Sequence, residues 1–181
     1  MAYKVTVDAG HGGFDNGATY NDRKEKEDNL NLALLVGQIL SDNGIDVNYT
    51  RTIDVYQRPV RKAEIGNASG SDFFVSIHRN SASYPNQYNG IQSLVYNKGD
   101  IKEVFANNMN KELGDVGYKI INVEERPNLV VLNQTQMPAV LVEAGFINSD
   151  VDNKLWDEKF YETGNAIARG IIKTIVDENL A

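Results

Sequence analysis

The chain has 181 residues, of which 41% are hydrophobic, which suits one domain with one sizeable core. Its net charge of −7 argues against broad nucleic-acid binding, which needs a basic surface. It contains no cysteine, so disulfides are excluded and any metal site must use nitrogen and oxygen ligands. Because no run of about 18 apolar residues occurs, we expect no membrane-spanning helix.

The amino terminus leads directly into a strand-like segment, without the apolar region of a signal peptide. The chain is therefore either a leaderless protein or a domain trimmed from a longer one, and the sequence leaves both alternatives open. No internal repeat, low-complexity tract or Pro/Gly-rich linker divides it. We therefore expect residues 1–181 to form a single domain, and we expect a monomer.

The first half of the chain alternates strand-like and helix-like segments. Residues 3–8 form a short apolar-rich run that predicts a strand. Residues 25–41 carry apolar side chains at helical spacing and predict a helix. Residues 47–50 predict a second strand, and residues 73–77 a third. This third run is too continuously apolar for a one-sided sheet, so we expect it to be buried on both faces.

The second half continues the alternation. Residues 91–96 alternate in polarity like a strand, and residues 101–109 have mostly helical apolar spacing. Two further buried strands are predicted at 129–132 and 139–142, and a closing helix is predicted over 167–175. This alternation is typical of an α/β sheet with helices on its faces.

The chain has only two histidines, and each follows a strand-like run. His11 comes shortly after the first predicted strand, and His78 comes directly after the strand at 73–77. Ligands of an open α/β sheet bind beyond the carboxyl ends of its strands, so the two imidazoles can converge on one point. A lone histidine after a strand is more often structural, but two in equivalent places favour a site.

Two segments offer carboxylates to the same region. Glu143 directly follows the predicted strand at 139–142, where burial ends, and charged groups are rarely buried without a partner. Glu143 is therefore a candidate functional residue at the same site as the two histidines, or alternatively it caps a neighbouring turn. The charged stretch at 22–30 is typical of a solvated helix start, yet one of its carboxylates is a candidate third metal ligand.

The glycine-rich loop at 10–18 has two interpretations. A phosphate cradle needs the lysine and hydroxyl pair of a P-loop, and these are missing. Glycine also permits backbone conformations that other residues avoid and allows close approach of a ligand. We therefore favour a loop shaped to expose His11.

These residues resemble a known family. The chain is similar to the zinc amidases of the Amidase_3 type, which cleave between N-acetylmuramic acid and the first L-alanine of the stem peptide. The resemblance spans nearly the whole chain in the expected order. The matching stretches are residues 7–13, 25–33, 50–51, 74–81, 137–147 and 164–172.

The resemblance implies a site and a fold. It implies that His11, Glu25 and His78 hold one Zn²⁺ per chain and that Glu143 is the catalytic carboxylate. It selects Glu25 over Glu27 as the third ligand, a choice that the residues alone leave open. It also implies a twisted, mostly parallel sheet of about six strands with helices on both faces.

The implied function is zinc-dependent hydrolysis of peptidoglycan at the bacterial cell wall. Two imidazoles, one carboxylate and an open fourth position form the catalytic pattern of zinc, which lowers the pKa of bound water from about 15.7 toward about 7. Glu143 would then move the proton, and each histidine would donate its other ring N–H to a carboxylate or carbonyl. An autolysin, a sporulation enzyme and a phage lysin all remain open.

Three residues are assigned roles around the substrate. Arg126 is a candidate partner for a stem-peptide carboxylate, or alternatively a surface charge. Asn80 is a candidate substrate contact, or alternatively holds the loop behind His78. Arg79 stands where the family usually has a small residue, and we expect it to alter the groove rather than the metal site.

Three other functions compete with this interpretation. A zinc peptidase would use the same four residues on another amide bond of the stem peptide. An inactive wall-binding module would lack hydrolysis, although all four key residues are present. A phosphate-binding domain built on the loop at 10–17 would bind nucleotide without a metal.

Overall fold

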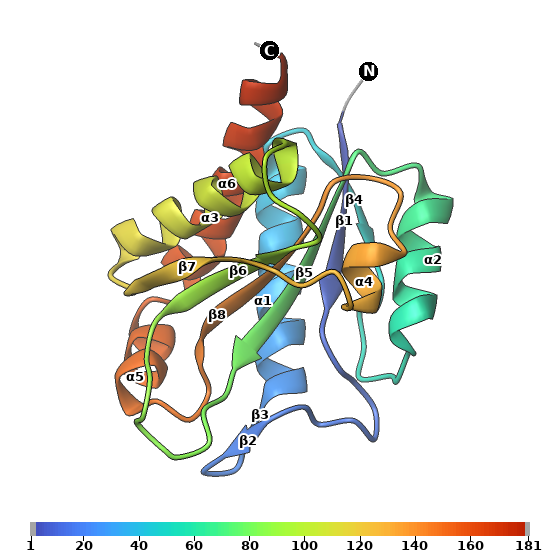
Figure 1. Ribbon diagram of the computed structural model, residues 1–181. Helices are drawn as coiled ribbons and strands as arrows, with labels where there is room; N and C mark the ends of the chain where they lie inside the picture. Colours follow the sequence, from blue (N-terminus) through green and yellow to red (C-terminus); the bar gives the residue numbers. More distant parts are fainter. Residues whose placement is uncertain (1–2, 180–181) are drawn as a thin grey trace.

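The computed structural model describes residues 3–179 and has the predicted α/β architecture (Figure 1). Its main sheet has six strands in the order β4-β1-β5-β8-β6-β7. Neighbouring strands run parallel except β6 and β8, which are antiparallel, so the prediction of a mostly parallel sheet is confirmed. The six strands are β1 (Lys4–Ala9), β4 (Asp46–Tyr49), β5 (Phe73–Asn80), β6 (Ile91–Val95), β7 (Ile120–Glu125) and β8 (Ala139–Phe146). A separate short hairpin joins β2 (Thr19–Tyr20) to β3 (Arg23–Lys24).

Helices cover both faces of the sheet, as predicted. They are α1 (Glu25–Asp42), α2 (Pro59–Ser69), α3 (Ile101–Val116), α4 (Val130–Asn133), α5 (Asp150–Glu158) and α6 (Phe160–Asn179). Helices α1 and α3 pack on one face with α6 against both of them, while α2 and α4 lie together on the other face (Figure 1). Among residues 3–179, none of these helices is long and apolar enough to cross a bilayer.

Alternation along the central strands divides the core in two. Successive strand side chains point to opposite faces, so Val75 and Val142 enter the large core under α1, α3 and α6. Phe74 and Leu141 enter a smaller core under α4. This smaller core covers only the first part of β5 and β8. The carboxyl ends of these strands are therefore left open on the α2–α4 face.

Two strands extend further than predicted. Strand β5 continues beyond residue 77 to Asn80, and β8 continues beyond residue 142 to Phe146. His78 and Glu143 therefore lie inside their strands, directly paired with each other in the parallel register. In each strand a polar residue, His78 or Glu143, interrupts the apolar run before the backbone pairing ends, which is why the apolar pattern underestimated the length of both strands.

The prediction of a strand at 129–132 is wrong. This segment includes the short helix α4, which begins after Leu129 in an extended conformation. Val131 and Leu132 are buried against Phe74 and Leu141 in the smaller core, so one helical turn accounts for the apolar run. A short apolar run has no periodicity that separates a buried strand from a buried turn.

Strand β7 and helices α2 and α5 were not predicted. Most residues of β7 are exposed because it is the edge strand of the sheet, so it lacks the apolar signal of a buried strand. Helix α2 starts at Pro59, and α5 starts after Ser149, whose side chain accepts a hydrogen bond from the Asp152 backbone. Both helices bury only a few residues, which explains why helical periodicity did not reveal them.

Close packing of α6 on α3 generates a test of the fold. A Cβ at Gly170 would lie 2.8 Å from the Met109 Cα, and backbone cannot move aside. We expect Gly170→Ala to lower the free energy of unfolding by about 1–3 kcal/mol, measured by urea denaturation, although alanine favours helix. The matched control is Gly164→Ala on the same helix, where the new methyl meets the flexible end of Leu35. Equal losses in both variants would contradict this account of the packing.

Candidate active site

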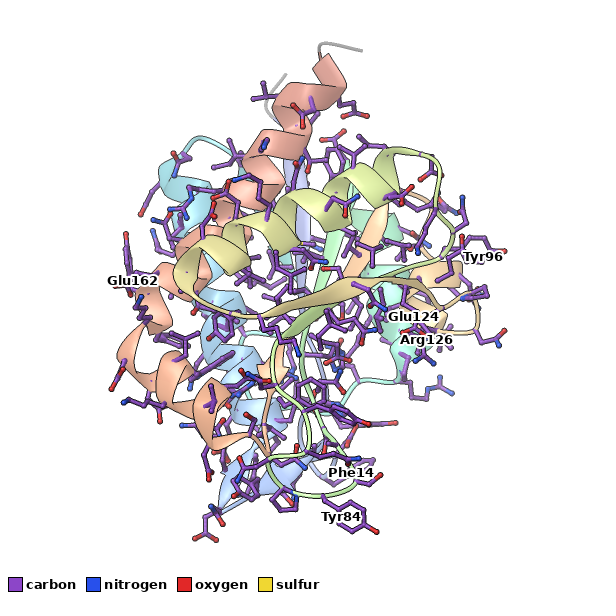
Figure 2. All side chains as sticks on the ribbon, turned by 60° about the vertical axis from the view of Figure 1, so that its left-hand side comes forward. Phe14, Tyr84, Tyr96, Glu124, Arg126 and Glu162 are labelled. Carbon is purple, nitrogen blue, oxygen red and sulfur yellow. The ribbon has the colours of Figure 1, made fainter. Side chains whose placement is uncertain are left out.

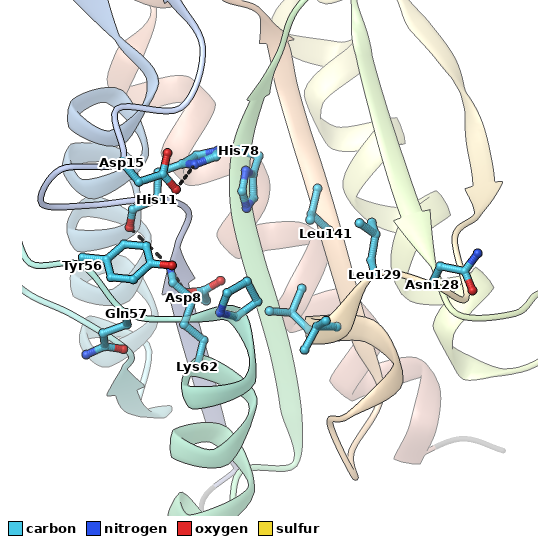
Figure 3. A pocket seen from close by; sticks show the side chains of 13 residues that line it. Asp8, His11, Asp15, Tyr56, Gln57, Lys62, His78, Asn128, Leu129 and Leu141 are labelled. Carbon is cyan, nitrogen blue, oxygen red and sulfur yellow. Dashed lines mark hydrogen bonds and ion pairs between the residues drawn. The ribbon is translucent and has the colours of Figure 1, made fainter.

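Two imidazoles and one carboxylate meet at the open end of the sheet. The distance from His11 Nε2 to Glu25 Oε2 is 3.1 Å, and that from His78 Nδ1 to Glu25 Oε1 is 2.9 Å. The two rings lie 5.0 Å apart and are nearly perpendicular (Figure 3). One ligand atom from each of the three residues lies within 4.8 Å of the others, so the group could hold a metal ion. The sequence correctly predicted that these side chains come together.

The loop after β1 orients His11. His11 adopts a positive φ of 59°, and its Nδ1 lies 2.8 Å from Asp15 Oδ2. The other Asp15 oxygen accepts a hydrogen bond of 3.0 Å from the Gly17 backbone N–H, so Asp15 joins the ring to its own loop. This contact leaves Nε2 facing Glu25. The expected carboxylate partner of the His11 ring is therefore Asp15, a residue that the sequence did not single out.

Gly10 provides the space for His78. A Cβ at Gly10 would lie 2.3 Å from the His78 ring, closer than any real contact. The backbone of the loop therefore approaches the imidazole directly, which only glycine permits. The glycine-rich sequence before His11 thus serves the packing of the second histidine as well as the exposure of the first.

Helix α1 places Glu25 between the two rings. Glu25 is its first residue and is only 4% exposed. Its Oε2 accepts a 2.9 Å hydrogen bond from the Ala18 backbone, and its Oε1 accepts one of 3.2 Å from the Arg79 backbone. The positive end of the helix dipole also favours a carboxylate here. Glu27 is instead exposed and pairs with Lys24, so the choice of Glu25 agrees with the structure.

The electrostatics of this group favour bound positive charge. Burial disfavours the charged imidazole, yet the hydrogen bonds and negative charges of Glu25 and Asp15 outweigh burial and raise the pKa of His11 to about 9. Burial opposes the charged form of Glu25 as well, but the two imidazoles hold its pKa well below the usual range. A cation that replaces the shared protons would meet two nitrogen donors and one anionic oxygen donor, which suits zinc.

Glu143 lies beside this group with a different environment. Its Cα is paired with that of His78 across β8 and β5. Burial raises the pKa of Glu143 to about 7, although the nearby His78 works in the opposite direction. Within the described part of the chain, its Oε2 is buried and has no hydrogen-bond partner. A carboxyl group whose pKa is raised toward neutrality beside a candidate metal site is a candidate for proton transfer.

A buried arginine ties the site to its framework. Arg51, which follows β4, donates to the carbonyl oxygens of Ala9 at 3.1 Å, Gly10 at 2.9 Å and Lys26 at 2.9 Å. These bonds join the end of β1 to the first turn of α1, the two segments that carry His11 and Glu25. Arg51 lies in one of the stretches that resemble the amidase family. Its role depends on contacts between distant segments, which the spacing of residues in the sequence does not reveal.

A second buried network lies beneath the loop. Asp8 of β1 accepts hydrogen bonds from Lys62 at 2.9 Å, Thr50 at 2.6 Å and Ser76 at 2.6 Å. Burial alone would raise the pKa of Asp8, but the Lys62 ammonium and the two hydroxyl groups lower it. Because every partner is satisfied, this network fixes the strand end rather than destabilising it.

The prediction that Arg79 alters the groove is wrong. Its side chain is fully buried on the opposite face of β5 from His78, because neighbouring strand residues alternate. Its guanidinium lies 2.6 Å from Asp28 Oδ2, donates to Asn153 at 2.8 Å and lies 4.1 Å from the centre of the Trp156 ring. Arg79 therefore links the start of α1 to α5 and has no place in the cleft.

Asn80 and Arg126 lie outside the group of three. The Asn80 Oδ1 accepts a 2.8 Å hydrogen bond from the Ser81 backbone, which holds the chain that leaves β5. Arg126 follows β7, and its Nε lies 2.9 Å from Glu124 Oε1 (Figure 2). A contact of either residue with substrate stays a prediction.

Comparison with known proteins identifies the family. Residues 5–173 match the family described as N-acetylmuramoyl-L-alanine amidase. The crystal structure of an N-acetylmuramoyl-L-alanine amidase from Clostridium difficile 630 superposes with a TM-score of 0.90 at 31% identity, over 96% of this chain and 97% of that one. The chain belongs to this amidase family, as the sequence resemblance predicted.

Curated relatives are longer than this chain. The sporulation-specific N-acetylmuramoyl-L-alanine amidase of Bacillus subtilis (strain 168) is 33% identical over 171 residues, which are 92% of this chain and 64% of that protein. The endolysin of Bacillus phage SPP1 is 34% identical over 186 residues, which cover 98% of this chain and 66% of the endolysin. The chain thus spans slightly less than two thirds of the length of these relatives.

The buried Arg79–Asp28 pair gives a test of the framework. Removing one partner of a buried ion pair leaves the other charge uncompensated, so we expect Arg79→Met to lower the free energy of unfolding by about 3 kcal/mol. The control is Arg23→Met, which removes the more exposed partner of Asp28 at 3.5 Å and should cost less than about 1 kcal/mol. Chemical denaturation measures both variants. A loss at Arg79 no larger than that at Arg23 would show that the buried pair has no such role.

Proposed function

We propose that residues 1–181 form a single zinc amidase domain that hydrolyses the amide bond between N-acetylmuramic acid and L-alanine in peptidoglycan. The observation that carries this proposal is the convergence of His11, Glu25 and His78. Membership of the amidase family supports the substrate and the bond. The proposed place of action is the bacterial cell wall, because the relatives include a sporulation-specific amidase and a phage endolysin.

The proposed cofactor is one Zn²⁺ per chain, held by His11, Glu25 and His78. The donor set fits this ion, because catalytic zinc sites combine imidazole and carboxylate ligands and keep one position open. When bound, zinc supplies polarisation of a carbonyl group and makes water a stronger nucleophile at neutral pH. Asp15 holds the His11 ring in position for this role, through the 2.8 Å contact to its Nδ1.

Glu143 is the proposed proton carrier. Its carboxylate takes a proton from the water that attacks the amide carbonyl, and it delivers a proton to the departing alanine nitrogen. One carbon–oxygen bond forms and the carbon–nitrogen bond breaks, so the products are a lactyl carboxylate and a free amine. A pKa of about 7 suits a group that both accepts and donates a proton near neutrality. Asn80 and Arg126 are proposed as substrate-side contacts, and the domain as a monomer.

Product analysis tests the reaction. We expect the chain to release new amino-terminal alanine from purified peptidoglycan, detected by amine labelling and mass spectrometry, and to stop when a chelator removes the metal. Glu143→Gln should reduce this release by at least about 100-fold, because it removes the proton carrier, while zinc content is retained. New termini within the stem peptide would instead identify a peptidase. Full activity of Glu143→Gln would overturn the role given to that residue.

Elemental analysis tests the metal ligands. His11→Ala, His78→Ala and Glu25→Gln should each lose zinc, because each removes one of only three protein donors. Glu27→Gln is the matched control, since Glu27 lies in the same first turn of α1 but is exposed. It should keep zinc near one per chain. Unchanged zinc content in any of the first three variants would remove that residue from the site.

A further inference from the structure

A largely apolar cavity adjoins the candidate metal site. It has a volume of about 340 Å³, and both His11 and His78 contribute to its lining. Figure 3 shows Leu129 and Leu141 beyond His78, on the side away from His11, and Tyr56 beside His11. The proposed reaction uses only the polar corner of this cavity. Its apolar remainder is available to a neighbouring part of the substrate.

The apolar surface continues outward from the cavity through two aromatic rings in contact with each other. The Phe14 ring lies 4.2 Å from the Tyr56 ring, centre to centre, with an angle of 34° between their planes. Tyr56 lines the cavity, whereas Phe14 is 80% exposed at the molecular surface (Figure 2). An exposed phenyl ring contributes little to folding, and an apolar surface continuous with a site is typical of a binding surface.

Hydrogen bonds among Gly13, Lys26 and Asp54 join the two segments that carry the rings. The Gly13 backbone N–H donates to Asp54 at 2.7 Å, and the nearly buried Lys26 ammonium donates to the Gly13 carbonyl at 2.8 Å and to Asp54 at 2.7 Å. These contacts fasten the loop of Phe14 to the segment that carries Tyr56. The two backbone segments that carry the rings are therefore held together before a ligand binds, which lowers the entropic cost of binding.

The opposite flank of the site has a different chemistry. Beyond Glu143, the Gln92 amide donates to Asn122 at 2.7 Å and to Glu124 at 2.6 Å, and it accepts from Asn80 at 3.4 Å. Gln92 is paired with Glu143 across β6 and β8, so this row of polar groups starts beside the proposed proton carrier. One flank thus presents aromatic faces, and the other presents amides and a carboxylate.

We propose that Phe14 and Tyr56 form a stacking platform for a sugar ring of the glycan strand. A sugar bound there would direct the stem peptide toward the polar flank formed by Gln92 and Asn122. This inference rests on the proposed function, because the amide bond between N-acetylmuramic acid and L-alanine joins a sugar substituent to a peptide. A pyranose has an apolar C–H face that matches the negative face of an aromatic ring. A peptide gains less from this platform, since its backbone needs donors and acceptors such as those of Gln92 and Asn122.

Binding measurements without hydrolysis test the platform. The ligand is peptide-free glycan, made of alternating N-acetylglucosamine and N-acetylmuramic acid, titrated into the chain and followed by NMR. We expect Phe14→Ala to weaken glycan affinity about fivefold and Phe14→Trp to retain it, because the indole offers an equivalent face. The control is Tyr161→Ala, which removes a 61% exposed ring on α6 and should leave affinity unchanged. Absence of glycan binding by the unmodified chain, or equal affinity in Phe14→Ala, would overturn the platform.

Kinetics on the same variants separate the platform from the reaction. On peptidoglycan, Phe14→Ala should raise KM about fivefold with kcat unchanged, because the ring binds substrate and does not touch the reacting bond. The affinity for isolated stem peptide should be the same in Phe14→Ala and the unmodified chain. A weaker affinity for the stem peptide alone would assign the platform to the peptide and overturn the proposal. If glycan binds but no alanine is released, the proposed reaction fails while the platform stands.

Discussion

The carboxylate of Glu25 is the contact on which the candidate site depends. Its two oxygens lie within about hydrogen-bond distance of one imidazole each, and so they join the loop after β1 to strand β5 through the first residue of α1. A buried carboxylate without partners is costly. Here the Ala18 and Arg79 backbone groups supply donors in addition to the two rings. The three segments are therefore held close enough together for the group to be able to hold a metal ion.

The polar interior around this contact has a structural role of its own. Arg51, Lys62 and Arg79 are all buried, and each binds carbonyl oxygens or a carboxylate close to the site. Buried charges are costly unless they are paired, so the pairing of these three cations favours one arrangement of the segments behind the histidines. The aliphatic core gives the domain its stability, and these networks fix the positions of the strand ends.

Much of the architecture and the group of three was readable from the sequence. The helical spacing before Asp42 and the continuous apolar run at 73–77 correspond to α1 and β5, and the strand ends correctly located both histidines. The strand predicted at 129–132 is wrong because a short apolar run has the same sequence pattern whether it is buried in a helical turn or in a strand. Arg79 was misplaced because the true end of β5, and hence the face of each residue, is set by backbone pairing. The partnership of Asp15 with His11 depends on loop geometry, which has no periodic signal.

The register between β5 and β8 has a consequence for how such a domain can diversify. His78 and Glu143 are opposite each other on adjacent parallel strands, so the ladder of backbone bonds alone sets their spacing at about 4.8 Å. The segments that carry Phe14 and Tyr56 lie outside this ladder. The loop that carries Phe14 also carries His11 and Asp15, so its length is constrained by the candidate metal site. Side-chain substitutions at Phe14 or Tyr56 would alter the surface beside the site, whereas the backbone ladder would keep His78 and Glu143 opposite each other.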